Sequence, residues 1–158
     1  MNITIGISDM KVANDTSVTL VTYSLGSCIG LTLFDPVARV GGMLHFMLPL
    51  SKINPEKAKE APLMFGDLAV PALIQGVLDL GGQKARLVAK AAGAASLFDD
   101  NKFFNIGERN YTVLRKVLWK NNILLAGEDC GGSVARTMYL EMATGATTIK
   151  FNGMNKAL

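Results

Sequence analysis

The sequence predicts an α+β fold in which mixed, mainly antiparallel β-sheets are layered against helices. Short segments rich in Val, Ile and Thr recur between turn residues, a pattern typical of antiparallel strands. Only two stretches show the longer apolar spacing of a helix. With 158 residues, 49% of them hydrophobic and 18% charged, the chain has the size and composition of one well-packed unit. We therefore expect residues 1–158 to form a single domain.

Strands are expected throughout the first third of the chain. Isoleucines alternate with small or polar residues at the start, and Val- and Thr-rich segments follow on either side of an interruption directly before Cys28. Asp35 and Pro36 suit the first two positions of a type I turn, which predicts a hairpin. The predicted strands are residues 3–8, 17–23, 29–34 and 40–48. The charged segment 52–60 is expected to be an exposed loop.

Two helices are expected in the remainder. An apolar stripe runs through residues 64–80, where Pro71 should kink the helix or reset its start. Asn105, followed by Glu108 at the third helical position, predicts a second helix that ends near Lys120. Its inward-facing residues are predicted to be Val113, Val117 and Trp119. The predicted strands here are residues 87–91, 123–126, 136–142 and 147–151.

Composition argues against several classes of function. The formal charge is +3 and no segment clusters Lys or Arg densely, so nucleic acid is not an expected partner. The N-terminal residues lack a secretory signal, and we interpret the uncharged run 16–34 as buried sheet, so we expect a cytoplasmic protein without membrane insertion. One histidine and two cysteines cannot supply a standard zinc site without carboxylates. No metal and no cofactor is expected.

Cys28 and His45 are the strongest candidates for chemistry. A hydrolytic cysteine needs a base, and His45 is the only imidazole in the chain. If the hairpin turns about Pro36 and Val37, the antiparallel register places Cys28 directly opposite His45, on one face of the sheet. A neighbouring imidazolium would then favour the thiolate at neutral pH. The alternative is that Cys28 is a small core residue and His45 an ordinary strand residue.

Residues around Cys28 could complete a catalytic site. Free amides in the Gly26-Ser27 turn could stabilise the thiolate and later an oxyanion. The hydroxyl of Thr22 could orient the imidazole, although Ser24 and Ser27 are comparable candidates by proximity.

Three further groups of residues have two interpretations each. The segment 128–132, Glu-Asp-Cys-Gly-Gly, suits a binding loop or metal contact, but we favour a solvated turn. The aromatic residues of a polar connection, Phe98, Phe103 and Phe104, are candidates for docking a protein partner or for folding back onto the core. Arg109 and Asn110, in the first turn of the second predicted helix, either meet the partner or hold the loop.

Several motifs together resemble the CheD family of chemoreceptor glutamine deamidases. They are Leu25-Gly26-Ser27-Cys28, Asp35-Pro36, the segments 42–49 and 93–98, Asn105 to Asn110, and residues 128–132, so that the resemblance covers nearly the whole chain. The chain departs from the family pattern at Ala94, where a second glycine is common, and at residues 133–136, where a glycine usually precedes the arginine.

The resemblance implies hydrolysis of receptor glutamine side chains to glutamate by a cysteine, a histidine and a threonine that match Cys28, His45 and Thr22. It also implies two partners, the cytoplasmic helices of methyl-accepting chemoreceptors and a CheC-type phosphatase that acts on phosphorylated CheY. The implied fold resembles the catalytic domain of cytotoxic necrotizing factor. A non-enzymatic module that binds receptor or CheC and modulates CheY dephosphorylation is the alternative, and receptor methyl ester hydrolysis would use the same acyl chemistry.

Overall fold

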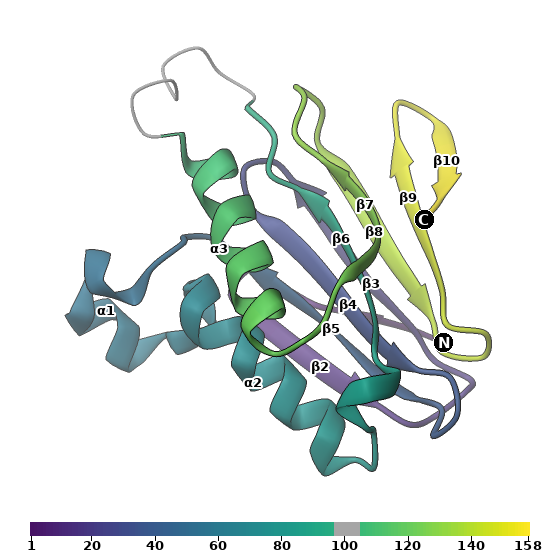
Figure 1. Ribbon diagram of the computed structural model, residues 1–158. Helices are drawn as coiled ribbons and strands as arrows, with labels where there is room; N and C mark the ends of the chain where they lie inside the picture. The colour runs from purple at the N-terminus through teal and green to yellow at the C-terminus, as the bar shows by residue number, and fades with distance from the viewer. Residues whose placement is uncertain (97–104) are drawn as a thin grey trace.

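Two β-sheets and a layer of helices form a three-layer arrangement in the computed structural model, which describes residues 1–96 and 105–158 (Figure 1). The strand order is β1-β3-β8-β9-β10 in the first sheet and β2-β5-β4-β6-β7 in the second. The pairs β1·β3 and β6·β7 are parallel, and the other pairs are antiparallel. The expected α+β class with mixed, mainly antiparallel sheets is confirmed.

The strands and helices have the following bounds. The strands are β1 (Asn2–Thr4), β2 (Asp9–Ala13), β3 (Thr19–Leu25), β4 (Ile29–Asp35), β5 (Val40–Phe46), β6 (Val88–Gly93), β7 (Leu125–Cys130), β8 (Arg136–Glu141), β9 (Ala146–Phe151) and β10 (Met154–Ala157). The α-helices are α1 (Pro55–Glu60), α2 (Gly66–Asp79) and α3 (Ile106–Lys120). Short 3₁₀ turns are η1 (Ser51–Ile53), η2 (Pro62–Met64) and η3 (Lys84–Arg86).

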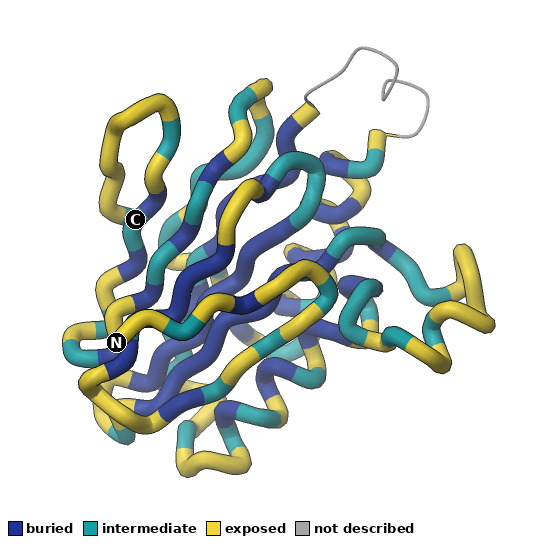
Figure 2. Tube along the Cα trace, turned by 180° about the vertical axis from the view of Figure 1, so that it is seen from behind, coloured by how far each residue is buried: buried dark blue, intermediate teal, exposed yellow. Residues whose placement is uncertain are grey.

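The second sheet lies between two apolar layers. Strands β4 and β5 are buried along their whole length, and they form the dark centre of Figure 2. Side chains such as Leu31 and Leu44 pack toward α2 and α3, whereas Phe34 and Met43 pack toward the first sheet. Because both faces of these strands are covered, their sequences are mainly apolar and show no regular alternation with polar residues. The segment 16–34, interpreted as buried sheet, supplies most of β3 and β4.

The β4–β5 hairpin has a longer loop than the sequence suggested. Asp35 pairs with Val40, so four residues form the connection, and Arg39 has a left-handed φ of 58°. The expected two-residue turn about Pro36 and Val37 is therefore wrong. Its consequence is a register displaced by two residues, in which His45 lies opposite Gly30 and not opposite Cys28.

Asp35 fixes this loop from inside the protein. Its fully buried carboxylate accepts hydrogen bonds from the N–H groups of Val37, Ala38 and Gln83 at 2.8–3.0 Å, and it pairs with Arg86 at 3.0 Å. Burial alone would raise the pKa of Asp35, but the Arg86 guanidinium and the three backbone N–H groups hold it well below its usual range. The carboxylate is therefore ionised in the folded protein.

Replacing Asp35 should strongly destabilise the fold. Asp35→Ala removes one partner of a buried pair and leaves the guanidinium and three N–H groups unpaired, so we expect a loss of about 3–5 kcal/mol in the free energy of unfolding. Urea denaturation at neutral pH measures this loss. Asp79→Ala is the control, since Asp79 is exposed and accepts one hydrogen bond from Gln75. Equal stabilities for the two variants would contradict the prediction.

Several elements were missed or misplaced by the sequence patterns. Strand β2 was not predicted because Ser8, at φ 60°, ends the alternation of the first strand and only Met10 and Val12 mark the next one. Strand β10 consists of exposed residues and has no apolar signal. The segment 52–60 contains α1, because Pro55 starts the helix and Asn54 caps it by accepting from the Lys57 N–H at 3.1 Å. Our loop prediction there was wrong.

The two predicted helices are present, with local differences. Helix α2 continues through Pro71. Helix α3 starts after Asn105, but the Asn105 side chain makes no capping hydrogen bond. Trp119 is 71% exposed, whereas the adjacent Leu118 is 1% exposed, so the predicted inward position of Trp119 is wrong. Glu128, Asp129 and Cys130 belong to β7 and not to a turn.

Candidate functional site

Thr22 and His45 meet across the space between the two sheets. Thr22 lies on β3 and His45 on β5, and their side chains are 0% and 1% exposed. The Thr22 Oγ1 atom is 2.7 Å from His45 Nδ1 and donates its hydrogen to the carbonyl oxygen of Ile5 at 2.8 Å. Because a hydroxyl has one hydrogen, Nδ1 must be the donor to Thr22. His45 therefore carries its proton on Nδ1, and Nε2 is a bare acceptor that has no partner among the described residues.

Cys28 lies on the same side of the second sheet. It immediately precedes β4 and is two residues before Gly30, the cross-strand partner of His45. Cys28 itself stands in the bend before β4, and it packs, half-buried, against the apolar cluster between the sheets. His45 meets Thr22 in the same space, so Cys28 and His45 lie on the same side of the second sheet. The expectation of direct opposition is wrong by two residues, but this shift preserves the face.

Burial keeps both groups neutral at rest. Desolvation lowers the pKa of His45 to about 4. Desolvation also raises the pKa of the Cys28 thiol, and the N–H of Cys28 itself opposes only part of that rise. The expected resting pair of thiolate and imidazolium is therefore corrected to a neutral thiol beside a neutral imidazole. Such a pair suits proton transfer during attack on a substrate.

The lowered His45 pKa predicts a pH-dependent stability. Between pH 6.5 and about pH 4 the unfolded chain takes up a proton on His45 that the folded protein does not. The contribution of His45 is thus complete above pH 6.5 and declines as the pH falls, by about 3 kcal/mol in all. Urea denaturation across this range should show a smaller loss of stability for His45→Gln than for the parent protein. Parallel pH profiles would mean that the folded and unfolded pKa values are similar.

The carbonyl groups of residues 26–28, which we call the Cys28 loop, each accept a hydrogen bond. Gly26 O accepts from Ala95 N at 2.8 Å, Ser27 O from Asn110 Nδ2 at 2.9 Å, and Cys28 O from Ala94 N at 2.9 Å. Within residues 1–96 and 105–158, no oxygen accepts from the N–H of Gly26 or Ser27. Backbone donors beside the thiol are thus available to a developing negative charge.

Ala94 keeps this loop arrangement despite its departure from the family pattern. It has a left-handed φ of 54°, a conformation that glycine adopts more easily. Its N–H nevertheless reaches Cys28 O. At the other departure, Arg136 is 5% exposed and donates to the carbonyl oxygens of Gly93 and Gly131 at 3.1 and 2.7 Å, while it pairs with Asp129. These contacts of Arg136 therefore fix the start of β8.

Unpaired buried polar atoms gather around these residues. In the described part of the chain they are Ser8 Oγ, His45 Nε2, Asn110 Oδ1 and Arg136 Nε. Ser8 donates its N–H to His45 O at 2.8 Å, and Asn110 contacts the Cys28 loop. Buried polar atoms without partners are uncommon and concentrate where a ligand or substrate acts. Ser8 had no sequence signal beyond being the polar last residue of the predicted strand 3–8.

The other predicted site residues are distributed as follows. Ser24 is exposed, and its side chain makes no hydrogen bond among the described residues. Asn110 is fully buried, so its predicted contact with a partner is corrected to a clamp inside the protein, whereas Arg109 is exposed. Phe98, Phe103 and Phe104 lie outside the described residues. Cys130 ends β7, where burial, followed by the charge of Glu128, raises the pKa of its thiol to about 12.

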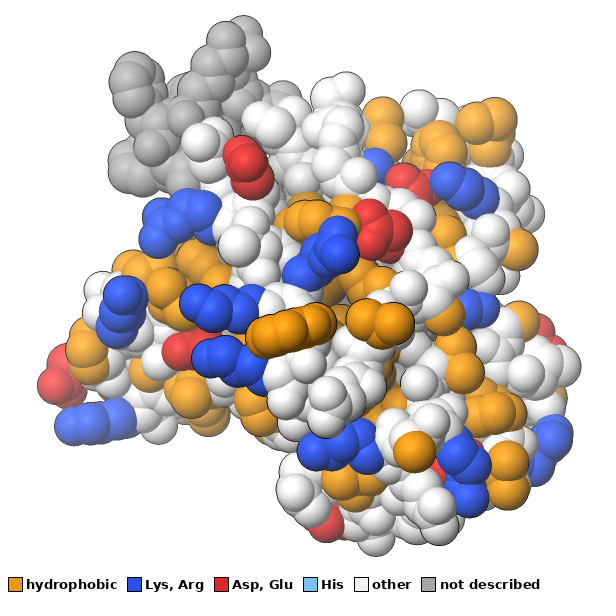
Figure 3. Space-filling view, viewed as in Figure 1, with side chains coloured by type: hydrophobic (Ala, Val, Ile, Leu, Met, Phe, Trp, Pro, Cys, Tyr) orange, Lys and Arg blue, Asp and Glu red, His pale blue; other side chains and the backbone are white. Residues whose placement is uncertain are grey.

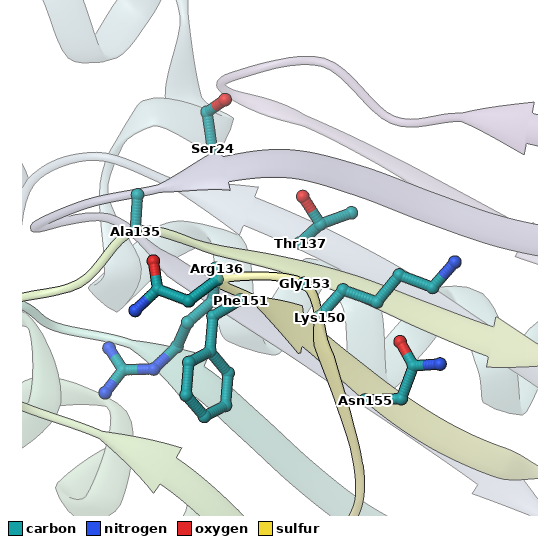
Figure 4. Close-up of a pocket in the computed structure, with 9 residues that line it drawn as sticks. Ser24, Ala135, Arg136, Thr137, Lys150, Phe151, Gly153 and Asn155 are labelled. Atoms are coloured by element: carbon teal, nitrogen blue, oxygen red, sulfur yellow. The ribbon is translucent and has the colours of Figure 1, made fainter.

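The largest of the hollows described here is not at this site. It has a volume of about 550 Å³ and lies over β8, β9 and the turn that follows β9, where the labelled side chains diverge (Figure 4). Two smaller hollows of about 200 and 300 Å³ lie beside Ala94, which binds the Cys28 loop. Ala94, Glu108 and Gly131 line both of them. Among the described residues, no three His, Cys, Asp or Glu side chains gather as a metal site would require. Cys28 and His45 line none of these three hollows.

Sequence comparison identifies the family. A family model described as CheD chemotactic sensory transduction matches residues 47–151. The chain belongs to the CheD family. Relatives extend the match over the Cys28 loop and His45. A protein from Solibacter usitatus is 48% identical over 99% of this chain and 92% of its own length. One from Syntrophus aciditrophicus is 45% identical over 96% and 95%. Both are named probable chemoreceptor glutamine deamidase CheD, the second with the suffix 1.

A solved structure supports the fold of this CheD family member. The crystal structure of the Bacillus licheniformis hypothetical protein YfiH superposes with a TM-score of 0.50 and 14% identity. The match covers 79% of this chain and 50% of YfiH, and at this identity it bears on the fold alone. No helix in the described part of the chain is both long and apolar enough to cross a membrane.

Proposed function

We propose that this CheD family member hydrolyses glutamine side chains on chemoreceptors to glutamate and releases ammonia. In this proposal Cys28 is the nucleophile, His45 the base and Thr22 the residue that orients the base. One observation carries it: the hydrogen bonds from His45 to Thr22 and from Thr22 to Ile5 fix the tautomer that leaves Nε2 free, on the face where Cys28 lies. Relatives named as chemoreceptor glutamine deamidases supply the substrate class.

The reaction is an acyl transfer in two halves. His45 Nε2 takes the thiol proton as Cys28 Sγ attacks the carboxamide carbon. The N–H groups of Gly26 and Ser27 donate hydrogen bonds to the oxyanion that forms. The imidazolium then donates that proton to the departing nitrogen, so ammonia leaves and a thioester remains. Water, deprotonated by His45, attacks the thioester, and the proton returns to the sulfur as glutamate is released. No metal or cofactor enters any step.

Mass spectrometry of a receptor tests the proposal directly. A chemoreceptor cytoplasmic fragment is incubated with the protein, and its peptides are examined for conversion of glutamine to glutamate. We expect conversion with the parent protein and none with Cys28→Ala. A receptor carrying methyl-esterified glutamates should be included, because ester cleavage without glutamine conversion would assign the same acyl chemistry to another substrate.

The proposed partners are chemoreceptor helices and a CheC-type phosphatase. We expect a shallow site, because Cys28 and His45 line none of the three hollows described above. Such a site suits a side chain presented by a folded partner better than a small molecule, which usually requires an enclosing pocket. Arg109 lies exposed in the first turn of α3. Figure 3, viewed as Figure 1, shows Lys and Arg side chains between apolar ones on this side of the molecule. Calorimetric titration with a CheC-type phosphatase, for the parent protein and Arg109→Ala, tests this proposal. Binding with unchanged affinity would remove Arg109 from the interface, and no binding would reject the partner.

A further inference from the structure

The pairing of β4 with β5 stops directly before the catalytic cysteine. The last cross-strand pair is Ile29 with Phe46. Beyond it the two chains form separate contacts: the N–H groups of Met47 and Leu48 both donate to Met64 O at 2.9 Å, and Cys28 O accepts from Ala94. No backbone hydrogen bond in the described residues joins the Cys28 loop to Met47 or Leu48, which follow β5.

The side chain of Asn110 bridges this interruption. It projects from α3, is 0% exposed, and donates from Nδ2 to Ser27 O at 2.9 Å and to Met47 O at 2.8 Å. Ser27 immediately precedes Cys28, and Met47 is two residues beyond His45. Both amide hydrogens are therefore used, one on each of the segments that carry the proposed nucleophile and base.

We propose that Asn110 is a positioning residue that fixes Cys28 relative to His45. A single nitrogen that binds two carbonyl oxygens holds both segments against one point, and burial excludes water that could replace it. Covalent catalysis depends on this spacing, since a displacement of about 1 Å can lower a rate about 100-fold. A primary amide is required, because a carboxylate of the same shape has no hydrogens and would face two carbonyl oxygens.

The inference rests on the proposed function for one readout and is independent of it for another. The first readout is receptor deamidation, measured as kcat and KM for Asn110→Ala and Asn110→Asp. We expect kcat to fall about 100-fold, with KM nearly unchanged because Asn110 is out of reach of the receptor. The second is the rate at which iodoacetamide alkylates Cys28 without receptor, resolved from Cys130 by peptide mass spectrometry. It should fall toward the rate of His45→Ala.

Two further variants separate positioning from general stability. Asn121→Ala is the matched control, since Asn121, the residue directly after α3, donates from Nδ2 to Val117 O at 2.9 Å, at the end of the helix away from Asn110. It should change stability and leave kcat and alkylation unchanged. Asn110→Ser keeps one donor and should recover part of kcat, which also decides the matter if Asn110→Ala does not fold. Lower stability with parental kcat and alkylation in the folded Asn110 variants would overturn the proposal. Slower alkylation in a protein that deamidates no receptor would reject only the proposed function.

Discussion

Cys28→Ala and His45→Ala should each reduce ammonia release from a chemoreceptor by about 10⁴-fold or more while leaving the fold intact, because neither half-reaction proceeds without both groups. Removing one member of a nucleophile–base unit costs about as much as removing both, so the double variant should be no slower than Cys28→Ala alone. Initial rates of ammonia release, with circular dichroism of each variant, measure this.

Cys130→Ala is the control for the choice of cysteine. The Cys130 thiol has a pKa of about 12, because it is buried beside Glu128, so it carries almost no thiolate at neutral pH. Its loss should affect stability through packing and leave the rate of folded enzyme nearly unchanged. Robust turnover by Cys28→Ala, or loss confined to Cys130→Ala, would identify the other cysteine as the nucleophile.

The candidate site was partly predictable because its chemistry narrows the choice of residues. A single histidine leaves one possible imidazole base, and the parity of an antiparallel register decides whether it shares a face with Cys28. That parity survived an error of two residues in the loop length. The exact register was not predictable, because the left-handed Arg39 and the buried contacts of Asp35 lengthen the loop, and both depend on residues distant in sequence, such as Gln83 and Arg86.

The roles of Thr22 and Asn110 required the tertiary structure. Several hydroxyl residues surround Thr22 in sequence, and only the packing of one sheet on the other brings Thr22 to the imidazole. Asn110 was predicted either to meet the partner or to hold the loop, and helical rotation directs it inward beside Gly107 and Val113. The electrostatic state also differs from the sequence expectation, since desolvation in the space between the sheets opposes charge on either member of the pair.

Thr22→Val should lower kcat by about 100- to 1,000-fold at unchanged KM, because the valine cannot accept from His45 Nδ1 and the tautomer with a free Nε2 loses its support. Thr22→Ser keeps the hydroxyl and should retain most of the activity. Thr32→Val is the matched control: Thr32 is also a buried strand threonine, whose hydroxyl contacts Thr147 at 3.2 Å and not the histidine. Steady-state deamidation kinetics compare the three. If Thr22→Val were as active as Thr32→Val, the imidazole would have to be oriented by packing alone, and the hydrogen bonds to Thr22 and Ile5 would have no part in catalysis.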